Sequence, residues 1–475
     1  MKGNWKYIKW GLIIALIVIS CLYQISDYPR MWYDEGVFSM VAANLATYRH
    51  YATTIISGHQ FLDFDPGITT GPTLILPVAA MYMLFGVNIL SGRLVSIVYL
   101  AGFLIMFYLL AKKLFGEDVA LLSFVSIFLT RFILIPLKWG RFVMGEVPAI
   151  FFLLLGLFLH SGAEESSRKY MYVLAGLAYG LSILTKEYVI LFLFPALLLD
   201  LILSKRRMND TFLMLFAAMI PVTLFYCVKF SLLGGVFITN TLGKGSFIEE
   251  FFSPSFIPFN TLFSIYITVP IVIALALFKK IRGRNFSGAE SLLLLIVIFD
   301  VLFFLVSAYI ARLALFLVIS NILLAYYLLD ISWVKNKIGQ IFAVLALISI
   351  FIVTSFLYAN ARNSSENNHD LMMMKSYLEI NVPAGKVIET PEYEVAALSW
   401  KNTFYMPLGM MPTRDPKKMD AFRKYDFVKS GAPYYLEGDF ARGLYSVRYT
   451  REKVGKYYRE QKKIGRYILY RRKGA

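Results

Sequence analysis

Long apolar segments separated by short polar loops make up most of the chain. Eleven segments are candidate transmembrane helices, because about 20 apolar residues cross roughly 30 Å of hydrocarbon. They lie at residues 8–25, 93–112, 118–136, 146–161, 170–185, 188–204, 211–232, 259–278, 289–308, 311–330 and 338–359. A further apolar stretch, Pro72–Phe85, is too short to span comfortably and contains Pro77. The pattern predicts a polytopic α-helical membrane protein with about eleven transmembrane helices.

The side of every later loop depends on whether Pro72–Phe85 crosses the membrane. If it does not cross and the N-terminus is cytoplasmic, all basic clusters between spans are cytoplasmic, as the positive-inside rule requires. These clusters are Lys112-Lys113, Arg168-Lys169, Lys205–Arg207, Lys279–Arg284 and Lys335–Lys337. We therefore expect Pro72–Phe85 to be a juxtamembrane helix within a first extracytoplasmic loop, residues 26–92.

The C-terminal part of the chain has the composition of a small soluble domain. It mixes charge with β-like runs at Lys386–Glu389 and Tyr467–Tyr470, and a helix is expected after Asn363. About 100 residues with this pattern suit a small α/β fold. We expect a transmembrane domain over residues 1–360 and an extracytoplasmic α/β domain over residues 361–475.

Composition supports membrane insertion and limits the kinds of partner that the protein is expected to bind. The chain is 58% hydrophobic with a mean hydropathy of +0.61, above the roughly 45–50% of soluble domains. Its net charge of +17 lies mostly in short loops and the tail, so the expected partner is the anionic membrane surface and not nucleic acid. Cys21 and Cys227 sit in apolar runs and offer no disulfide framework. The first apolar segment lacks a small-residue cleavage site, which predicts an uncleaved span.

Charged residues at membrane depth are costly and usually functional, and here they gather near the outer ends of the predicted helices. Asp34 and Glu35 precede a short predicted helix, Val37–Tyr48. Negative charge at a helix N-terminus is favoured by about 0.3–1 kcal/mol, so helix capping is one interpretation. The other is a general base directed at a hydroxyl acceptor.

A second candidate region is the turn-rich stretch Asp63–Pro72. An ordinary loop with Asx turns would explain its composition. Its two aspartates and two threonines can also bind a metal ion or sugar hydroxyls. These four residues are Asp63, Asp65, Thr69 and Thr70.

Three further outer turns carry charge. Arg141 has the character of a cation that extends to the membrane interface, whereas Glu146 enters the next apolar run and needs a partner. Lys186 and Glu187 lie between two spans with almost no loop, where a mutual ion pair is the simple interpretation. Arg312 lies between two spans, and arginine suits phosphate through its planar set of donors.

The grouping of these charges separates three kinds of protein. A transporter would place them near mid-membrane, often with repeat symmetry, and a flippase of lipid-linked sugars is the alternative of that kind. A membrane scaffold with a partner-binding outer domain is another alternative. Clustering at one interface, beside a long loop, favours an enzyme that acts on a membrane-embedded substrate.

The sequence resembles the C-type (GT-C) glycosyltransferases of the protein O-mannosyltransferase and lipid A aminoarabinose transferase kind, similar to glycosyltransferase family 39. Five motifs carry the likeness. In the first loop they are Asp34-Glu35, followed by Ala43-Asn44-Leu45, and Gly71-Pro72, which leads to Ser91-Gly-Arg93-Leu94. The later motifs are Gly140-Arg141 with Glu146-Val-Pro148, then Leu184-Thr-Lys186-Glu187, and finally Tyr309 with Arg312. It covers the first 200 residues well. The first loop departs from the family at Ile68–Pro72, which lacks the basic residue of a Lys-Pro-Pro-like element.

The resemblance implies an inverting transfer of a sugar from a polyprenyl- or dolichyl-phosphate donor. The acceptor would be a hydroxyl of a protein, lipid or glycan at the extracytoplasmic face. Asp34 would be the general base, and Glu35 and Glu146 would position the acceptor or a metal ion. The predicted phosphate-binding residues are Arg93, Lys186, Arg312 and Arg141. The predicted acceptor or metal vicinity is Asp63, Asp65, Thr69, Thr70, Glu187 and Tyr309. No cofactor follows from the motifs, and a divalent metal ion is left open.

Overall fold

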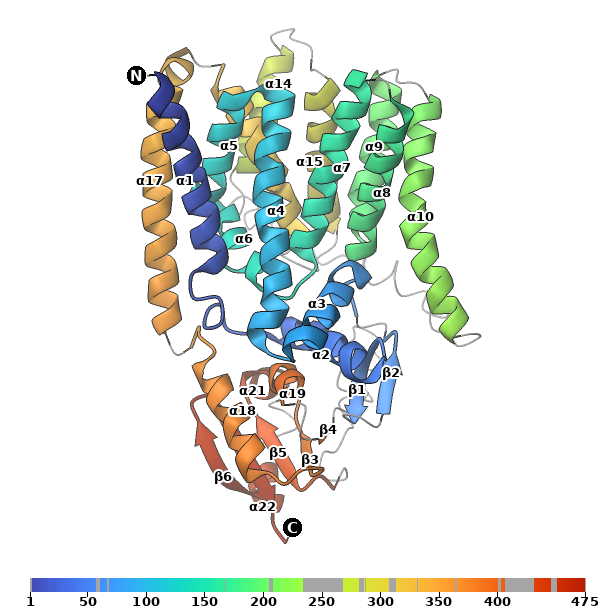
Figure 1. Cartoon of the computed structure of the whole chain (residues 1–475), viewed down its shortest axis with the longest axis vertical. Coiled ribbons are helices and arrows are strands. Elements are labelled where there is room, and N and C mark those ends of the chain that lie inside the picture. The colour runs from blue at the N-terminus through green and yellow to red at the C-terminus, as the bar shows by residue number, and fades with distance from the viewer. Residues whose placement is uncertain are drawn as a thin grey trace. The chain divides into compact units, whose positions relative to one another are not determined.

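The computed structural model is predominantly helical (Figure 1). It describes residues 2–56, 60–65, 68–166, 168–204, 208–233, 268–281, 286, 288–306, 313–330, 332–363, 365–399, 403–405, 431–445 and 451–474. The chain forms two compact units. Unit 1 comprises Met1–Tyr23, Ile97–Arg141 and Gly145–Phe356, and unit 2 comprises Gln24–Ser96, Phe142–Met144 and Leu357–Ala475.

Unit 1 is a group of apolar helices. Two helices, α4 (Ile89–Phe115) and α17 (Ser332–Arg362), contribute residues to both units. The other helices that the structure describes in this unit are α1 (Lys2–Leu22), α5 (Glu117–Leu129), η1 (Arg131–Ile133), α6 (Leu134–Leu137), η2 (Trp139–Arg141), α7 (Glu146–Ser166), α8 (Lys169–Thr185), α9 (Val189–Ser204), α10 (Met208–Leu233), α14 (Thr268–Ile281), α15 (Gly288–Val306), η3 (Leu313–Ile319) and α16 (Ser320–Leu328). Each of the eleven predicted apolar segments overlaps at least one of the described helices.

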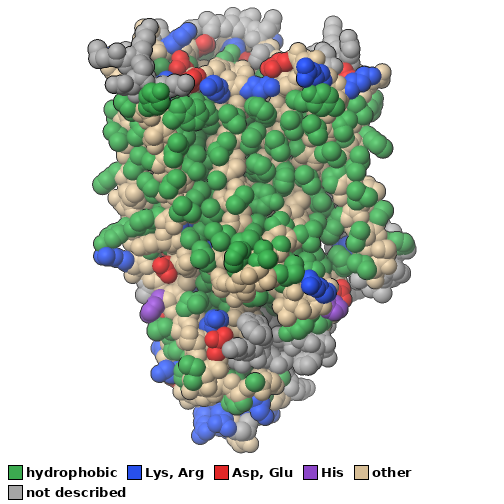
Figure 2. Space-filling model, viewed as in Figure 1, with side chains coloured by type: hydrophobic (Ala, Val, Ile, Leu, Met, Phe, Trp, Pro, Cys, Tyr) green, Lys and Arg blue, Asp and Glu red, His purple; other side chains and the backbone are tan. Residues whose placement is uncertain are grey.

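Within the described residues, four helices are long and apolar enough to cross a membrane, or five if the bent pair Glu117–Leu129 and Leu134–Arg141 is one span. Shorter apolar helices lie at Tyr7–Leu22, Pro72–Phe85, Val189–Ile202 and Leu315–Leu328. Hydrophobic side chains cover most of the helical surface of unit 1, and Lys and Arg gather along one edge of it (Figure 2). The chain is therefore a multi-pass membrane protein, whereas the count of eleven spans and the orientation stay predictions.

Close helix packing in unit 1 depends on small residues. Gly176 and Gly180 of α8 face α10, where added Cβ atoms would collide with the carbonyl oxygens of Met214 and Ala218. Glycines four apart let two backbones approach, as is common between membrane helices. Ser182 of α8 also donates to the carbonyl of Ala149 in α7, at 2.7 Å. These contacts fix the ends of α7 and α8, where two predicted site residues lie.

Unit 2 contains a seven-stranded mixed sheet in the order β2-β1-β4-β3-β5-β7-β6. Strand β3 pairs in parallel with β4 and β5, and the other pairings are antiparallel. The strands are β1 (Ala52–Ile56), β2 (Gln60–Asp63), β3 (Val387–Glu389), β4 (Thr403–Tyr405), β5 (Tyr434–Glu437), β6 (Tyr458–Ile464) and β7 (Tyr467–Arg472). The predicted β-like runs become β3 and β7. The strands β1 and β2 were not predicted.

In the described part of unit 2, six helices accompany this sheet, beside the first residues of α4. They are α2 (Tyr33–Tyr48), α3 (Pro72–Phe85), α18 (His369–Asn381), α19 (Tyr393–Leu398), α21 (Asp439–Tyr445) and α22 (Arg451–Tyr457). The predicted helix after Asn363 is α18, and the predicted juxtamembrane helix is α3. Because β1 pairs with β4, the first loop and the C-terminal segment share one sheet.

Candidate active site

The predicted acidic pair lies at the start of α2. Asp34 and Glu35 occupy its first turn, and the helix begins at Tyr33, earlier than the predicted Val37. Trp32 precedes the helix in an extended conformation and makes no side-chain cap. Asp34 is half-buried, whereas Glu35 is 1% exposed. Adjacent carboxylates therefore have different environments, and Asp34 is the more accessible of the two.

Glu35 forms a bidentate ion pair with Arg93 of α4. Nε of Arg93 donates to Oε1 at 2.9 Å, and Nη2 donates to Oε2 at 2.7 Å. The Val143 amide also donates to Oε1 of Glu35, at 3.2 Å. A planar guanidinium matches a carboxylate in this geometry, which adds direction to the attraction. The described bonds of Glu35 thus tie α2 to α4 and to residue 143.

Arg93 is fully buried and has further partners in unit 2. Its Nη1 donates to the carbonyl of Ile25 at 2.9 Å, and its guanidinium lies 5.7 Å from the Phe142 ring centroid. The start of α4 is held by Asn88, whose side chain accepts from the Ser91 amide at 2.9 Å. Removing one partner of a buried pair leaves an uncompensated charge. The Glu35–Arg93 pair therefore connects the first turn of α2, which carries Asp34, to α4. The phosphate-binding role of Arg93 stays a prediction.

A second buried ion pair lies in unit 1. Nζ of Lys186 is 3.2 Å from Oε1 of Glu146, and both side chains are no more than 4% exposed. Glu146 is in the first turn of α7, and Lys186 directly follows the last turn of α8. Each charge has the sign that its helix end favours. Glu146 has thus found the partner that its place in an apolar run required.

The neighbouring charged residues have different surroundings. Arg141 is fully buried, and its guanidinium donates to the carbonyl of Tyr23. A cation that reached water at the interface would be exposed, so burial argues against that interpretation of Arg141. Glu187 is exposed and accepts a hydrogen bond from the Tyr226 hydroxyl of α10.

The first-loop aspartates bond to residues in or just before strand β1. Asp65 is buried and accepts from the Thr53 hydroxyl at 2.6 Å. Asp63 lies 2.9 Å from Nδ1 of His50. Thr69 is exposed and Thr70 is buried. The partners Thr53 and His50 were not among the predicted site residues.

Two predicted site residues, Tyr309 and Arg312, lie outside the described residues. In the part of the chain that the structure describes, no group of three or more His, Cys, Asp or Glu side chains is arranged to hold a metal ion. A metal role for the first-loop aspartates therefore stays a prediction.

Contacts from distant sequence also hold the first loop, and sequence reasoning missed them. Asn368 is buried, and its side chain accepts from the Met31 amide at 2.7 Å and donates to the carbonyls of Ser26 and Pro29. Met31 and Asn368 are 337 positions apart. Asn44 had a local signal, since it belongs to the family-like motif of α2. It donates to the Ala52 carbonyl at 2.9 Å and fixes α2 against β1.

Known proteins match the chain over different lengths. An uncharacterized protein from Aquifex aeolicus (strain VF5) is 28% identical over 180 residues, which are 38% of this chain and 34% of that protein. The match therefore spans about a third of that relative.

Solved structures match the fold over nearly the whole chain. ArnT from Cupriavidus metallidurans, solved with undecaprenyl phosphate bound, has a TM-score of 0.70 at 11% identity and covers 100% of this chain and 99% of that one. The oligosaccharyltransferase AglB from Archaeoglobus fulgidus, in complex with an inhibitory peptide and a dolichol-phosphate, has a TM-score of 0.56 at 12% identity. That match covers 99% of this chain and 74% of AglB.

The family model for dolichyl-phosphate-mannose-protein mannosyltransferase matches residues 71–229. This segment includes Arg93, Arg141, Glu146 and Lys186. The family segment and the fold agree with the predicted class: residues 71–229 are similar to the mannosyltransferase family, and the whole chain has a fold similar to that of ArnT.

Proposed function

We propose that the protein transfers a sugar from a polyprenyl-phosphate donor to a hydroxyl acceptor at the extracytoplasmic face of the membrane. The observation that carries the proposal is the placement of Asp34. It is half-buried in the first turn of α2, directly beside the bidentate Glu35–Arg93 pair that holds this turn. The full-length likeness to a transferase solved with undecaprenyl phosphate supports the donor class.

In the proposed reaction, Asp34 is the general base. The acceptor oxygen attacks the anomeric carbon of the sugar while its proton passes to the Asp34 carboxylate. The bond between the anomeric carbon and the phosphate oxygen breaks, and the polyprenyl phosphate leaves with the bonding electrons. Attack opposite to the leaving group inverts the anomeric centre. General base catalysis of this kind contributes typically about 10²–10⁴-fold to the rate.

Negative charge grows on the phosphate as it leaves, and fixed cations stabilise it. Lys186 and Arg141 are the described cations that we assign to this task, together with the predicted Arg312. An ammonium has three donors, so Lys186 can serve a carboxylate and a phosphate at the same time. Glu146 would then keep Lys186 in place. The acceptor is a hydroxyl of a protein, lipid or glycan, and the C-terminal residues lie outside the cell or in the periplasm.

The proposal is tested with Asp34→Asn, which keeps the size of the side chain and removes the base. Purified enzyme is incubated with undecaprenyl or dolichyl phosphate carrying mannose or aminoarabinose, with a total envelope extract as acceptor. Released polyprenyl phosphate is measured. We expect a loss of at least about 10²-fold in turnover with unchanged binding of undecaprenyl phosphate.

Asp27→Asn is the matched control, since Asp27 is an exposed aspartate of the same loop. It should keep full turnover. If Asp34→Asn transferred sugar as fast as the unaltered enzyme, Asp34 would not be the base. If no donor of the panel released its carrier in the unaltered enzyme, the donor class would be wrong.

A further inference from the structure

The segment that leads into Asp34 is bonded to the C-terminal part of unit 2. Asn368 serves three backbone groups of residues 26–31 with its side chain, and its own amide donates to the Asp27 carbonyl at 3.0 Å. The Arg30 amide donates to the Glu366 carbonyl at 2.7 Å. These bonds fix the backbone of the segment, because a buried amide or carbonyl that lost its partner would cost about 1–3 kcal/mol.

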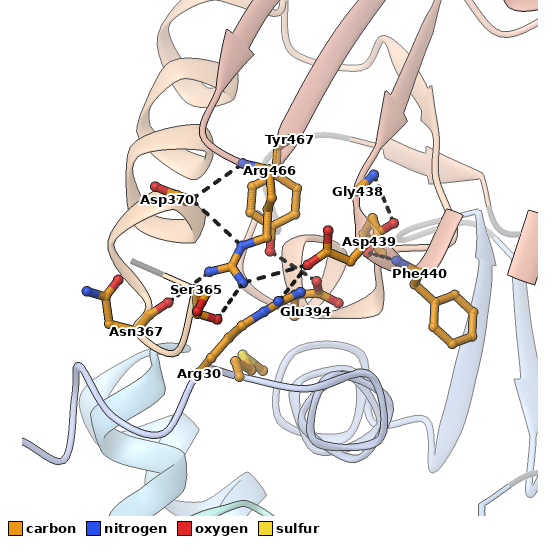
Figure 3. A network of polar contacts seen from close by, with 12 residues as sticks. Arg30, Ser365, Asn367, Asp370, Glu394, Gly438, Asp439, Phe440, Arg466 and Tyr467 are labelled. Carbon is orange, nitrogen blue, oxygen red and sulfur yellow. Dashed lines mark hydrogen bonds and ion pairs between the residues drawn. The ribbon is translucent and has the colours of Figure 1, made fainter. Parts of the chain in front are cut away.

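An ion pair adds to these bonds. Nη1 of Arg30 lies 2.6 Å from Oδ2 of Asp439 (Figure 3). Nη2 of Arg442 donates to Oδ1 of the same carboxylate at 2.8 Å. Burial disfavours its charge, yet the hydrogen bond from Arg442 and the charge of Arg30 hold the pKa of Asp439 below its usual range. Asp439 is therefore ionised at neutral pH and attracts Arg30. Arg466 borders the same carboxylate at 3.9 Å and reaches the Asn367 carbonyl at 2.8 Å.

Aromatic contacts reach the residue next to Asp34. The Tyr33 ring stacks on the Phe440 ring, with centroids 3.9 Å apart and planes 11° apart. The Tyr393 ring meets Tyr33 edge-on at 4.8 Å. Phe440 follows Asp439 in the first turn of α21, and Tyr393 begins α19. Two short helices of the C-terminal segment thus enclose the residue that precedes the proposed base.

We propose that Asn368, Asp439 and Phe440 are positioning residues for Asp34, so that the C-terminal segment sets the position and orientation of the catalytic carboxylate. The proposal rests on the function assigned to Asp34 above. These three residues do not act on substrate. They act through Arg30, Tyr33 and the backbone of residues 26–31.

Loss of the contacts made by Asn368, Asp439 and Phe440 is expected to lower kcat. A base must lie within hydrogen-bond reach of the proton that it takes, and a displacement of about 1 Å can cost roughly 10²-fold in rate. Donor binding does not require Asp34 to be well aimed, so KM for the donor should change little. The shape of the pH profile should not change, because the carboxylate is still present.

The first test removes the ring stack. Phe440→Ala should lower kcat by about 10- to 100-fold, with KM and the shape of the kcat/KM pH profile unchanged. Phe440→Tyr keeps the ring and should restore kcat. Tyr470→Ala is the control, because Tyr470 is also half-buried and stacks on Tyr435 in the same unit. If Phe440→Ala matched Tyr470→Ala in kcat, or if Phe440→Tyr failed to rescue, the positioning role would be wrong.

The second test keeps side-chain size but replaces a hydrogen-bond donor with a negatively charged acceptor. Asn368→Asp replaces the amide that donates to the Ser26 and Pro29 carbonyls with an oxygen that repels them. Its control is Asn381→Asp, where an exposed amide donates only within α18, to the Tyr377 carbonyl. We expect a loss of kcat of about 10-fold or more in Asn368→Asp alone.

An Asn368→Asp enzyme with full kcat would overturn the proposal. Asp34→Asn is assayed alongside with the same donors. An inactive Asp34→Asn together with fully active Phe440→Ala and Asn368→Asp would refute only the positioning role. A fully active Asp34→Asn would refute the proposed base itself.

Discussion

Gly36→Ala tests whether α2 must lie against α19 for the protein to fold and act. A Cβ added at Gly36 would lie 2.5 Å from the Glu394 nitrogen, 2.6 Å from the Tyr393 carbonyl carbon and 2.9 Å from Cα of Glu394. Ordinary contact begins at 3.4 Å. All three atoms belong to the backbone, so no side chain can rotate away, and the two helices must move apart.

The size of the effect follows from two opposing terms. Overpacking typically costs about 1–3 kcal/mol, while alanine favours a helix over glycine by about 1 kcal/mol. We expect a net loss of up to about 2 kcal/mol in the stability of the protein. The first turn of α2 should move with the helix, so kcat should fall further than stability alone explains, by up to roughly 10²-fold.

The assay compares unfolding midpoints in detergent with the release of polyprenyl phosphate. Gly455→Ala is the matched control, because Gly455 lies in helix α22 of the same unit and an added Cβ there meets nothing within 4 Å. It should be neutral or slightly stabilising. A Gly36→Ala protein with the midpoint and kcat of the unaltered enzyme would show that α2 does not depend on α19 as described.

Three further predictions concern the buried charges. Arg93→Met should lower stability by about 3–5 kcal/mol because it strands a buried Glu35, and adding Glu35→Gln should recover part of that loss in chemical unfolding. Lys186→Met should lower kcat by about 10²–10³-fold, whereas Glu146→Gln should lower it less, both measured as carrier release. Burial, and then the charge of the neighbouring carboxylate Glu394, raises the pKa of Glu392 well above its usual range. The folded state thus retains this proton where the unfolded state has lost it, so stability should fall as pH rises above about 4.5. That fall should be smaller in Glu392→Gln, and equal slopes for the two proteins would contradict it.

Hydropathy predicted the helices because the signal is local. Each predicted apolar segment overlaps a described helix, and the charged residues at helix ends include two residue pairs that the fold brings together. Glu35 meets Arg93, and Glu146 meets Lys186. Sequence named all four residues without pairing them. Lys186 was instead paired with the adjacent Glu187, because spacing along the chain suggested the nearest opposite charge.

Long-range contacts account for what sequence reasoning missed. The run Ala52–Ile56 is short, and its strand becomes evident only where it pairs with β2 and β4. The role of Asn368 was equally hidden, since its backbone partners lie in the first loop. No local pattern marks such a residue. The sequence predicted a chemical role for Asp34, whereas it gave no sign of the contacts that support its helix.

The shared sheet has a consequence for biogenesis. Translation delivers Asp34 to the membrane long before Asn368 or β4 exists, and domains generally begin to fold as they are made. The hydrogen bond between Met31 and Asn368 joins residues 337 positions apart, so it can form only after the last part of the chain has been made. A nascent or C-terminally clipped chain would insert its spans and still lack an ordered acid at the first loop. If Asp34 is the catalytic base, as proposed, activity would be reached only after the C-terminal segment is made, and a copy truncated before that segment would be inactive.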